Sequence, residues 1–208
     1  MKSGPFRPFE TTWEDWVLGG GILRAFENPE LPLEVEIGPG DDDFLLEQAG
    51  ERPDRNWLGI EYSRKRVRRT ARRVEQSLGT PGNLRLVWRP AVDVVGRFLT
   101  PARVHRYHIY FPDPWPKKHH HRYRLLAPEF LGDLRASLEP GGEVRFCTDH
   151  LEYGQETLAA FAEVGGWENR LPAPGYEILQ PGDRLTVFEK RWREEGRIIH
   201  RLLLGRGT

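Results

Sequence analysis

The stretch LEVEIGPG, from Leu33 to Gly40, decides the fold class of this 208-residue chain. Leu33–Ile37 reads as a buried strand, and the glycine turn after it leads into a helix predicted over Phe44–Ala49. A strand that passes through a tight glycine turn into a helix opens a βαβ unit. The stretch therefore predicts a sheet of the α/β class.

Strands and helices continue to alternate along the chain. The expected strands are Asn56–Glu61, Leu84–Trp88, Val104–Phe111 and Glu143–Thr148, and the expected helices are Arg64–Leu78, Val92–Leu99, Leu126–Leu138 and Glu152–Val164. A final pair of strands is expected at Tyr176–Leu179 and Leu185–Trp192, with the last strand antiparallel. This order predicts a mostly parallel, doubly wound sheet, in which ligands bind beyond the carboxyl ends of the strands.

The length fits one main domain with two flanking segments. We expect an N-terminal extension at 1–32 that packs on the domain, the domain itself at 33–192, and a basic C-terminal tail at 193–208. The N-terminus has no apolar signal-peptide region, and no apolar run approaches the roughly 20 residues that span a bilayer. These features predict a cytoplasmic protein without a membrane partner.

The composition limits which partners, disulfides and metal sites the chain is expected to have. Lys+Arg and Asp+Glu both number 31, so net charge by itself points to no nucleic-acid partner. The lone Cys147 excludes an intramolecular disulfide and a multi-cysteine zinc site. Adjacent side chains diverge, so the triplet His119-His120-His121 is not expected to hold a metal ion.

The glycine turn is a candidate cofactor site. Gly38 and Gly40 let the backbone approach a ligand closely. The carboxylates of Asp41-Asp42-Asp43 follow at once and repel a pyrophosphate, which favours a cationic or uncharged cofactor such as S-adenosylmethionine over a dinucleotide. Glu61, at the end of the next strand, is placed to accept hydrogen bonds from ribose hydroxyls. An ordinary turn followed by a surface glutamate is the structural alternative.

The loop FPDPWPKK, from Phe111 to Lys118, is the most unusual segment. Three prolines restrict the backbone around Asp113 and Trp115. A tryptophan beside a basic run can stack on a base while the cations hold phosphates. The basic blocks Arg64–Arg73 and Lys117–Arg124 provide such cations, although a solvated helix face explains the first block equally well.

The segment FPDPWPKKHHHRYRL, residues 111–125, resembles the FPDPWxKxRHxKRR signature of the tRNA (guanine-N7)-methyltransferase family. The resemblance runs from about Glu34 to Glu189. It implies a Rossmann-like methyltransferase fold, S-adenosylmethionine as cofactor, and methylation of a guanine in the tRNA variable loop. It further implies tRNA as the partner. We expect a monomer or homodimer, and no obligate protein partner is evident from the sequence.

The resemblance also implies roles for particular residues. Glu36 and Glu61 contact the cofactor, and Asp113 contacts the cofactor and stands at the reaction centre as the catalytic residue. The residues implied to contact the substrate RNA are Lys117, Asp149, Thr186 and Glu189.

The chain departs from the family pattern at three places. Asp42 stands where the family has the third glycine of GxGxG, and Val187 replaces the lysine of the Thr-Lys-Phe-Glu motif. Pro90-Ala91 stands where the family has an adenine-contacting Asp-Ala pair, and Asp93 follows three residues on.

Two alternative functions stay open. One is an exocyclic-amino nucleic-acid methyltransferase, although Asp113-Pro114 runs into Trp115 without the second proline of that motif. The other is a non-catalytic tRNA-binding protein with a degenerate cofactor pocket.

Overall fold

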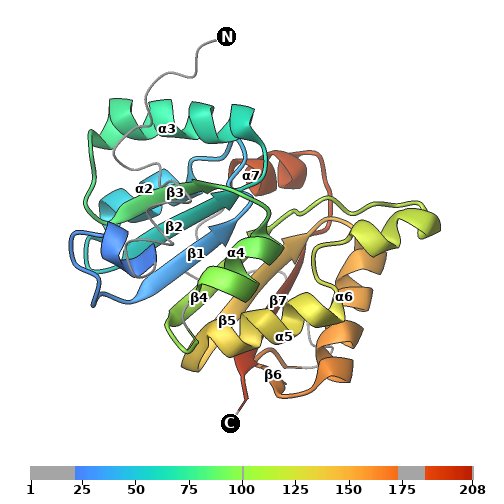
Figure 1. The fold of residues 1–208 in the computed structure, drawn as a ribbon. Coiled ribbons are helices and arrows are strands. Elements are labelled where there is room, and N and C mark those ends of the chain that lie inside the picture. The colour runs from blue at the N-terminus through green and yellow to red at the C-terminus, as the bar shows by residue number, and fades with distance from the viewer. Residues whose placement is uncertain (1–21, 100, 173–185, 208) are drawn as a thin grey trace. The chain divides into compact units, whose positions relative to one another are not determined.

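The computed structural model describes residues 22–99, 101–172 and 186–207, which form two compact units divided after Thr100 (Figure 1). Unit 1 ends at Thr100 and unit 2 begins at Pro101. Among the described residues, no helix combines the length and the apolar character that crossing a membrane requires.

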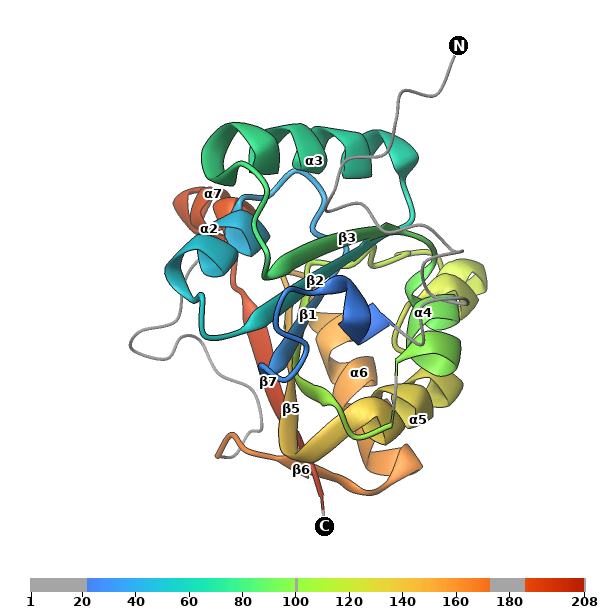
Figure 2. The ribbon, with the colours of Figure 1, turned by 60° about the vertical axis from the view of Figure 1, so that its left-hand side comes forward.

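Unit 1 is built on three parallel strands. Its elements are η1 (Ile22–Ala25), β1 (Leu33–Ile37), α2 (Phe44–Glu51), β2 (Asn56–Glu61), α3 (Arg64–Leu78), β3 (Leu84–Trp88) and α4 (Ala91–Phe98). Strand β2 lies between β1 and β3 and pairs in parallel with both. Helices α2 and α3 contact each other, and α4 lies on the opposite face of the strands (Figure 2).

Helix α3 shows why the sequence predicted its bounds correctly. The Ser63 hydroxyl accepts a hydrogen bond from the Arg66 amide at 3.5 Å, and Gly79 follows the last turn with φ of 68°. Serine at the N-cap and glycine after the C-terminus are common helix boundaries. Val67, Ala71 and Val74 are buried at helical spacing, so the arginines occupy the exposed face.

The described part of the predicted N-terminal extension packs on unit 1. Ile22 and Phe26 are buried, and the Glu27 amide donates to the Gly82 carbonyl at 3.1 Å.

Unit 2 is a mixed sheet with helices. Its elements are β4 (Val104–Tyr110), η2 (Lys118–Tyr123), α5 (Pro128–Ser137), β5 (Leu138–Thr148), α6 (Leu151–Val164), β6 (Trp167–Asn169), α7 (Val187–Glu194) and β7 (His200–Arg206). Strands β4 and β5 are parallel, whereas β7 runs antiparallel to both β5 and β6. Helix α6 contacts α5, β5, β6 and β7.

The prediction of a strand at Leu185–Trp192 is wrong. Val187–Glu194 forms helix α7, because the Thr186 hydroxyl caps it by accepting from the Glu189 amide at 3.1 Å. The other member of that pair, Tyr176–Leu179, lies outside the described residues. The antiparallel final strand does exist, but it is β7, within the residues that the sequence assigned to a basic tail.

Strand β5 also differs from its predicted bounds. It begins at Leu138 rather than Glu143, so Pro140-Gly141-Gly142 belongs to the strand. Gly141 has φ of 80°, and the pairing with β4 shifts register between Val104 and Arg106. The irregular start of the strand explains why the sequence pattern missed it.

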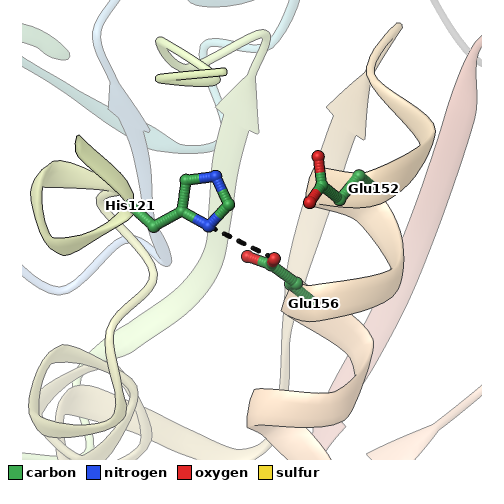
Figure 3. Close-up of side chains that lie close together, drawn as sticks. All are labelled: His121, Glu152 and Glu156. Carbon is green, nitrogen blue, oxygen red and sulfur yellow. Dashed lines mark ion pairs between the residues drawn. The ribbon is translucent and has the colours of Figure 1, made fainter. Parts of the chain in front are cut away.

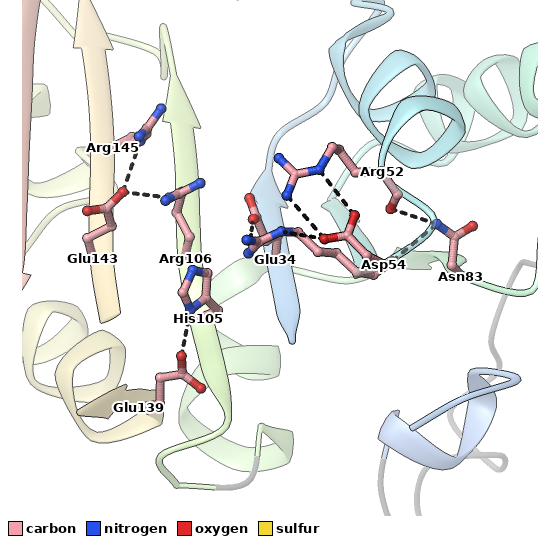
Figure 4. Close-up of polar contacts among 10 residues, drawn as sticks. Glu34, Arg52, Asp54, Asn83, His105, Arg106, Glu139, Glu143 and Arg145 are labelled. Carbon is pink, nitrogen blue, oxygen red and sulfur yellow. Dashed lines mark hydrogen bonds and ion pairs between the residues drawn. The ribbon is translucent and has the colours of Figure 1, made fainter. Parts of the chain in front are cut away.

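Each unit contains ion pairs to a buried glutamate (Figure 4). In unit 1 the buried Glu34 accepts from Arg55 at 2.8 Å. In unit 2 Glu143 accepts from Arg106 at 2.6 Å and from Arg145 at 3.1 Å. Burial alone raises the pKa of Glu143, but the two guanidinium groups outweigh burial and hold it below its ordinary value.

Candidate functional site

The turn after β1 has the backbone that the sequence predicted. Gly38 has φ of 76° and Gly40 has φ of 58°, in the left-handed region that favours glycine. The Gly38 amide donates to the Ile60 carbonyl of β2 at 2.8 Å. A Cβ atom added to Gly38 meets no heavy atom of the described residues within 4 Å, so the space beside this backbone is open to a ligand.

Glu61 ends β2 and braces the turn. Its Oε2 accepts from the Gly40 amide at 3.3 Å, and its Oε1 accepts from the Ser63 amide at 2.8 Å. The side chain is buried, and each carboxylate oxygen has a second lone pair. Glu61 therefore fixes the turn and still has acceptor capacity for ligand hydroxyls.

Glu36, the penultimate residue of β1, is a buried acceptor that needs a donor. It is 3% exposed, and within the described part of the chain its Oε2 has no hydrogen-bond partner. Burial raises the pKa of Glu36 well above its ordinary value, and the charges of Asp42 and Glu61 raise it further, against the opposing effect of Arg73. A buried unsatisfied carboxyl group costs free energy that a donor or a cation on a ligand offsets.

Asp42, the first departure from the family pattern, takes part in the start of helix α2. Its Oδ1 accepts from the Phe44 amide at 2.9 Å, and the residue is 6% exposed. The side chain therefore satisfies one of the amides that the first turn of a helix leaves without a partner.

Side chains of helix α3 also donate hydrogen bonds to the turn after β1. The Arg73 guanidinium donates to the carbonyls of Asp41 and Asp42, at 2.7 and 2.8 Å, and to the carboxylate of Asp43 at 2.8 Å. The Thr70 hydroxyl donates to the Gly40 carbonyl at 3.1 Å. The turn is therefore held in place by α3 as well as by the start of α2.

Pro90, the second departure, begins helix α4. Its carbonyl accepts from the Asp93 amide at 3.1 Å, and Asp93 lies half-buried in the first turn of that helix. Nearby in the sequence, Trp88 at the end of β3 is 41% exposed, and its Nε1 donates to the Tyr62 carbonyl at 2.9 Å. Trp88 therefore lies at the carboxyl end of a parallel strand, where ligands bind in sheets of this class. Its position in chain order was the signal that could have marked it in the sequence.

The proline-rich loop of unit 2 has an unusual backbone. Phe111 and Trp115 have φ of 51° and 44°, which is rare for residues other than glycine. The Phe111 amide donates to the Cys147 carbonyl at 2.8 Å, and its ring packs edge-on against Trp192 with centroids 4.4 Å apart. Asp113 lies between these two strained positions and is exposed. Such strain persists only where the surroundings hold it, and it is concentrated at functional sites.

Arg124 ties this loop to helix α6. Its Nε donates to the Pro114 carbonyl at 2.8 Å, and its guanidinium also pairs with Glu156. The guanidinium lies 4.8 Å from the ring centroid of Tyr153, and the residue is 7% exposed. Arg124 is therefore a structural member of the basic block, unlike the exposed Lys117.

Three aromatic rings form a partly exposed group on the loop and η2, which we call the aromatic cluster: Trp115, His120 and Tyr123. The Trp115 ring lies 5.6 Å from the His120 ring and 5.3 Å from the Tyr123 ring. Trp115 is 36% exposed and Tyr123 is 51% exposed. The Arg122 guanidinium lies 4.9 Å from the Tyr123 centroid, so the cluster combines ring faces with a cation, as single-stranded RNA sites do.

The remaining predicted substrate residues have partners within unit 2. Asp149 accepts from Arg197 at 2.7 Å. Thr186 is buried as the cap of α7. Glu189 is 1% exposed, and both of its oxygens accept from Arg201 at 2.7 Å. Thr186 therefore caps α7, and Glu189 joins α7 to β7.

His121 has acidic neighbours that the sequence analysis did not find. Ligand atoms of His121, Glu152 and Glu156 lie within 4.8 Å of one another (Figure 3). The His121 Nδ1 is 3.4 Å from the Glu156 Oε1, while Arg124 pairs with the other Glu156 oxygen. Both glutamates are exposed and come from helix α6, so spacing near the histidine triplet did not reveal them.

Solved structures confirm the fold of this chain. It resembles the 16S rRNA methyltransferase KamB with a TM-score of 0.62, at 17% identity over 85% of this chain and 88% of that one. It also resembles a mutant of the 16S rRNA (adenine(1408)-N(1))-methyltransferase from Catenulisporales acidiphilia, solved with its cosubstrate SAM. That likeness has a TM-score of 0.58 and 16% identity, and covers 100% of this chain and 94% of the other. The predicted Rossmann-like fold is thereby confirmed.

A family described as "Putative methyltransferase" matches residues 30–202. The family match and the fold together show that the chain is a methyltransferase that uses S-adenosylmethionine. A tRNA (guanine-N(7)-)-methyltransferase from Syntrophotalea carbinolica is 36% identical over 81% of this chain and 72% of its own length. The enzyme of that name from Halorhodospira halophila is 34% identical over 98% of this chain and 89% of its own length. The chain belongs to the tRNA (guanine-N(7)-)-methyltransferase family.

Proposed function

We propose that this enzyme transfers a methyl group from S-adenosylmethionine to N7 of a guanine in the variable loop of tRNA. The observation that carries the proposal is the strained proline loop, which holds the exposed Asp113 beside the aromatic cluster in a chain that belongs to this family. A carboxylate and stacking rings in one loop suit a purine substrate.

The residues proposed to bind the cofactor lie in unit 1. When bound, S-adenosylmethionine supplies a methyl group activated by a positively charged sulfur. Gly38 and Gly40 give the backbone room to approach it, and Glu61 accepts hydrogen bonds from its ribose. Glu36 offers its unpartnered Oε2 to a donor or positive charge of the same ligand.

The substrate side needs no general base. Guanine N7 carries an in-plane lone pair and no proton, so its attack on the methyl carbon requires position rather than deprotonation. The bound cofactor would supply the methyl group and keep the electron pair of the C–S bond, so this chain's residues need only hold N7 in line with that bond. The guanine ring becomes cationic, and a fixed carboxylate nearby stabilises that charge. We assign this role to Asp113, which also suits the N1–H and exocyclic amine of guanine as an acceptor.

The tRNA backbone is expected to bind exposed cations. On α3 these include Lys65, Arg66, Arg68 and Arg72, and Lys117 lies at the start of η2. Asp149, through its pair with Arg197, is proposed at the edge of the RNA site, and Thr186 and Glu189 support that site by holding α7. We propose that the chain acts in the cytoplasm as a monomer or homodimer without another protein.

The test is methyl transfer from labelled S-adenosylmethionine to two tRNA transcripts. One has a guanosine and the other an adenosine at the target position of the variable loop. Incorporation into the guanosine transcript alone, with chain cleavage there after reduction and aniline treatment, supports the proposal.

Each other result favours a different function. Label that resists aniline cleavage indicates an exocyclic-amino methyltransferase. Binding of tRNA without transfer to either transcript indicates a non-catalytic tRNA-binding protein.

A further inference from the structure

Three carboxyl groups are buried together in unit 1 around the turn after β1. Glu36, Asp42 and Glu61 are 3%, 6% and 2% exposed, and the charges of Asp42 and Glu61 both act on Glu36. Arg73 is the positive charge that acts on Glu36 from α3, but it donates to the carbonyls of Asp41 and Asp42 and to Asp43. The negative charge around the turn is therefore only partly neutralised by the positive charge of Arg73.

Asp42 is the member of this group that the family pattern does not contain. It replaces a glycine of GxGxG, so this chain places one further carboxylate in the turn. Its capping of the Phe44 amide at 2.9 Å needs only an acceptor oxygen and not a negative charge. An asparagine supplies the same acceptor, so the charge has a consequence separable from the cap.

The reaction changes the charge of the cofactor by one. The sulfonium of S-adenosylmethionine is positive, whereas the thioether of S-adenosylhomocysteine is neutral, and apart from the transferred methyl group the two ligands are alike. A buried carboxylate acts on such a charge over several ångströms even without direct contact, because the interior screens weakly.

We propose that Asp42 makes the turn after β1 favour the positively charged cofactor over its neutral product. This inference rests on the assignment of S-adenosylmethionine as cofactor. The added charge binds the sulfonium form more tightly and leaves the thioether form without a matching gain. The ratio of cofactor affinity to product affinity is therefore higher than in a chain with glycine at this position.

The experiment is calorimetric titration of the full chain with S-adenosylmethionine and with S-adenosylhomocysteine. Asp42→Asn retains the acceptor for Phe44 and removes the charge. Asp43→Asn is the matched control, because it removes a neighbouring charge whose side chain is 48% exposed. Thermal unfolding of each variant verifies that the turn and α2 remain folded.

We expect Asp42→Asn to weaken S-adenosylmethionine binding about tenfold and to leave S-adenosylhomocysteine binding nearly unchanged. Asp43→Asn should preserve the ratio of the two affinities. An unchanged ratio in Asp42→Asn, whether both affinities hold or both fall together, overturns the inference.

A second variant and the wild type separate this inference from the proposed function. Asp42→Gly restores the family pattern. Like Asp42→Asn, it should lower the ratio of S-adenosylmethionine affinity to S-adenosylhomocysteine affinity. Methyl transfer to tRNA by wild type, together with an unchanged ratio in the variants, rejects the role of Asp42 alone. A wild-type chain that binds neither ligand rejects the cofactor assignment and this inference with it.

Discussion

At the scale of single residues, burial makes similar carboxyl groups behave differently. Glu61 is buried but accepts two backbone hydrogen bonds, whereas Glu36 is buried with an unsatisfied oxygen. Asp113 is exposed on a loop whose backbone is strained on either side. Glu61 braces the turn, Glu36 has an oxygen without a partner among the described residues, and Asp113 faces solvent.

Glu36 should make the stability of the unliganded protein fall as pH rises. Its folded-state pKa lies above the ordinary value of 4.5, so between those two values the folded state holds a proton that the unfolded state has lost. Across that window Glu36 lowers the free energy of unfolding by up to about 1.4 kcal/mol per pH unit. Glu36→Gln should remove this slope and stabilise the protein above the window.

Urea unfolding of wild type and Glu36→Gln over a series of pH values measures this slope. Comparing the two proteins removes the contribution of other groups, such as Glu143, whose lowered pKa acts in the opposite direction at acid pH. Identical slopes in both proteins would show that the Glu36 pKa is not raised.

Asp113→Asn should slow methyl transfer without unfolding the loop. The substitution keeps the shape and removes the charge that stabilises the cationic guanine, so we expect kcat to fall about 100-fold with little change in the KM for tRNA. Single-turnover methyl transfer measures the chemical step directly.

Asp133→Asn on α5 is the matched control, since it removes a carboxylate elsewhere in unit 2. Retention of wild-type kcat by Asp113→Asn would contradict an essential charge and leave only a hydrogen-bonding role.

At the scale of helices and strands, regular patterns in the sequence predicted the structure well. The bounds of β1, β2, β3 and α3 agree with the prediction, because apolar runs and cap residues are local signals. Helix α7 was missed, since Val187 and Phe188 favour a strand in a short window. Its cap at Thr186 and the pair Glu189–Arg193 at i,i+4 favour the helix instead.

Thr186→Ala should test the capping role of that residue. Loss of the hydroxyl that accepts from the Glu189 amide should lower the free energy of unfolding by about 1 kcal/mol. Thr186→Ser should restore most of this loss, because serine caps equally well.

Measurement of tRNA affinity in the same two variants separates the two roles of Thr186. If Thr186→Ala weakens tRNA binding without affecting stability, the residue contacts RNA and its cap contributes little.

Helix α3 should contribute to RNA binding through its exposed cations. Replacing both Arg68 and Arg72 by alanine should weaken tRNA binding equally for substrate and non-substrate transcripts. The logarithm of the binding constant decreases as the logarithm of salt concentration rises. If each of the two cations contacts a phosphate, the slope of this line should become less negative by about 1.4 in the double variant. Filter binding over a range of salt concentrations measures that slope.

Arg52→Ala is the matched control for α3, because Arg52 is exposed in the same unit but pairs with Asp54 at 3.1 Å. An unchanged slope in the double variant would mean that these two arginines of α3 face solvent and do not contact RNA phosphates.

At the scale of the whole molecule, the sequence placed its candidate site residues relative to the strands but did not reveal all their partners. The loops after strands were predictable because chain order fixes which residues follow each strand. The contacts of Glu189 with Arg201 and of His121 with Glu156 join different elements, so local patterns carried no sign of them. The particular role of each side chain therefore had to come from the structure.

The position of β7 has a consequence for how the chain is made. Strand β7 pairs with both β5 and β6, yet it consists of residues 200–206. All three strands of unit 1 have left the ribosome long before then, so that unit is able to fold while synthesis continues. Until β7 emerges, one edge of β5 has exposed backbone donors and acceptors that invite pairing with other chains.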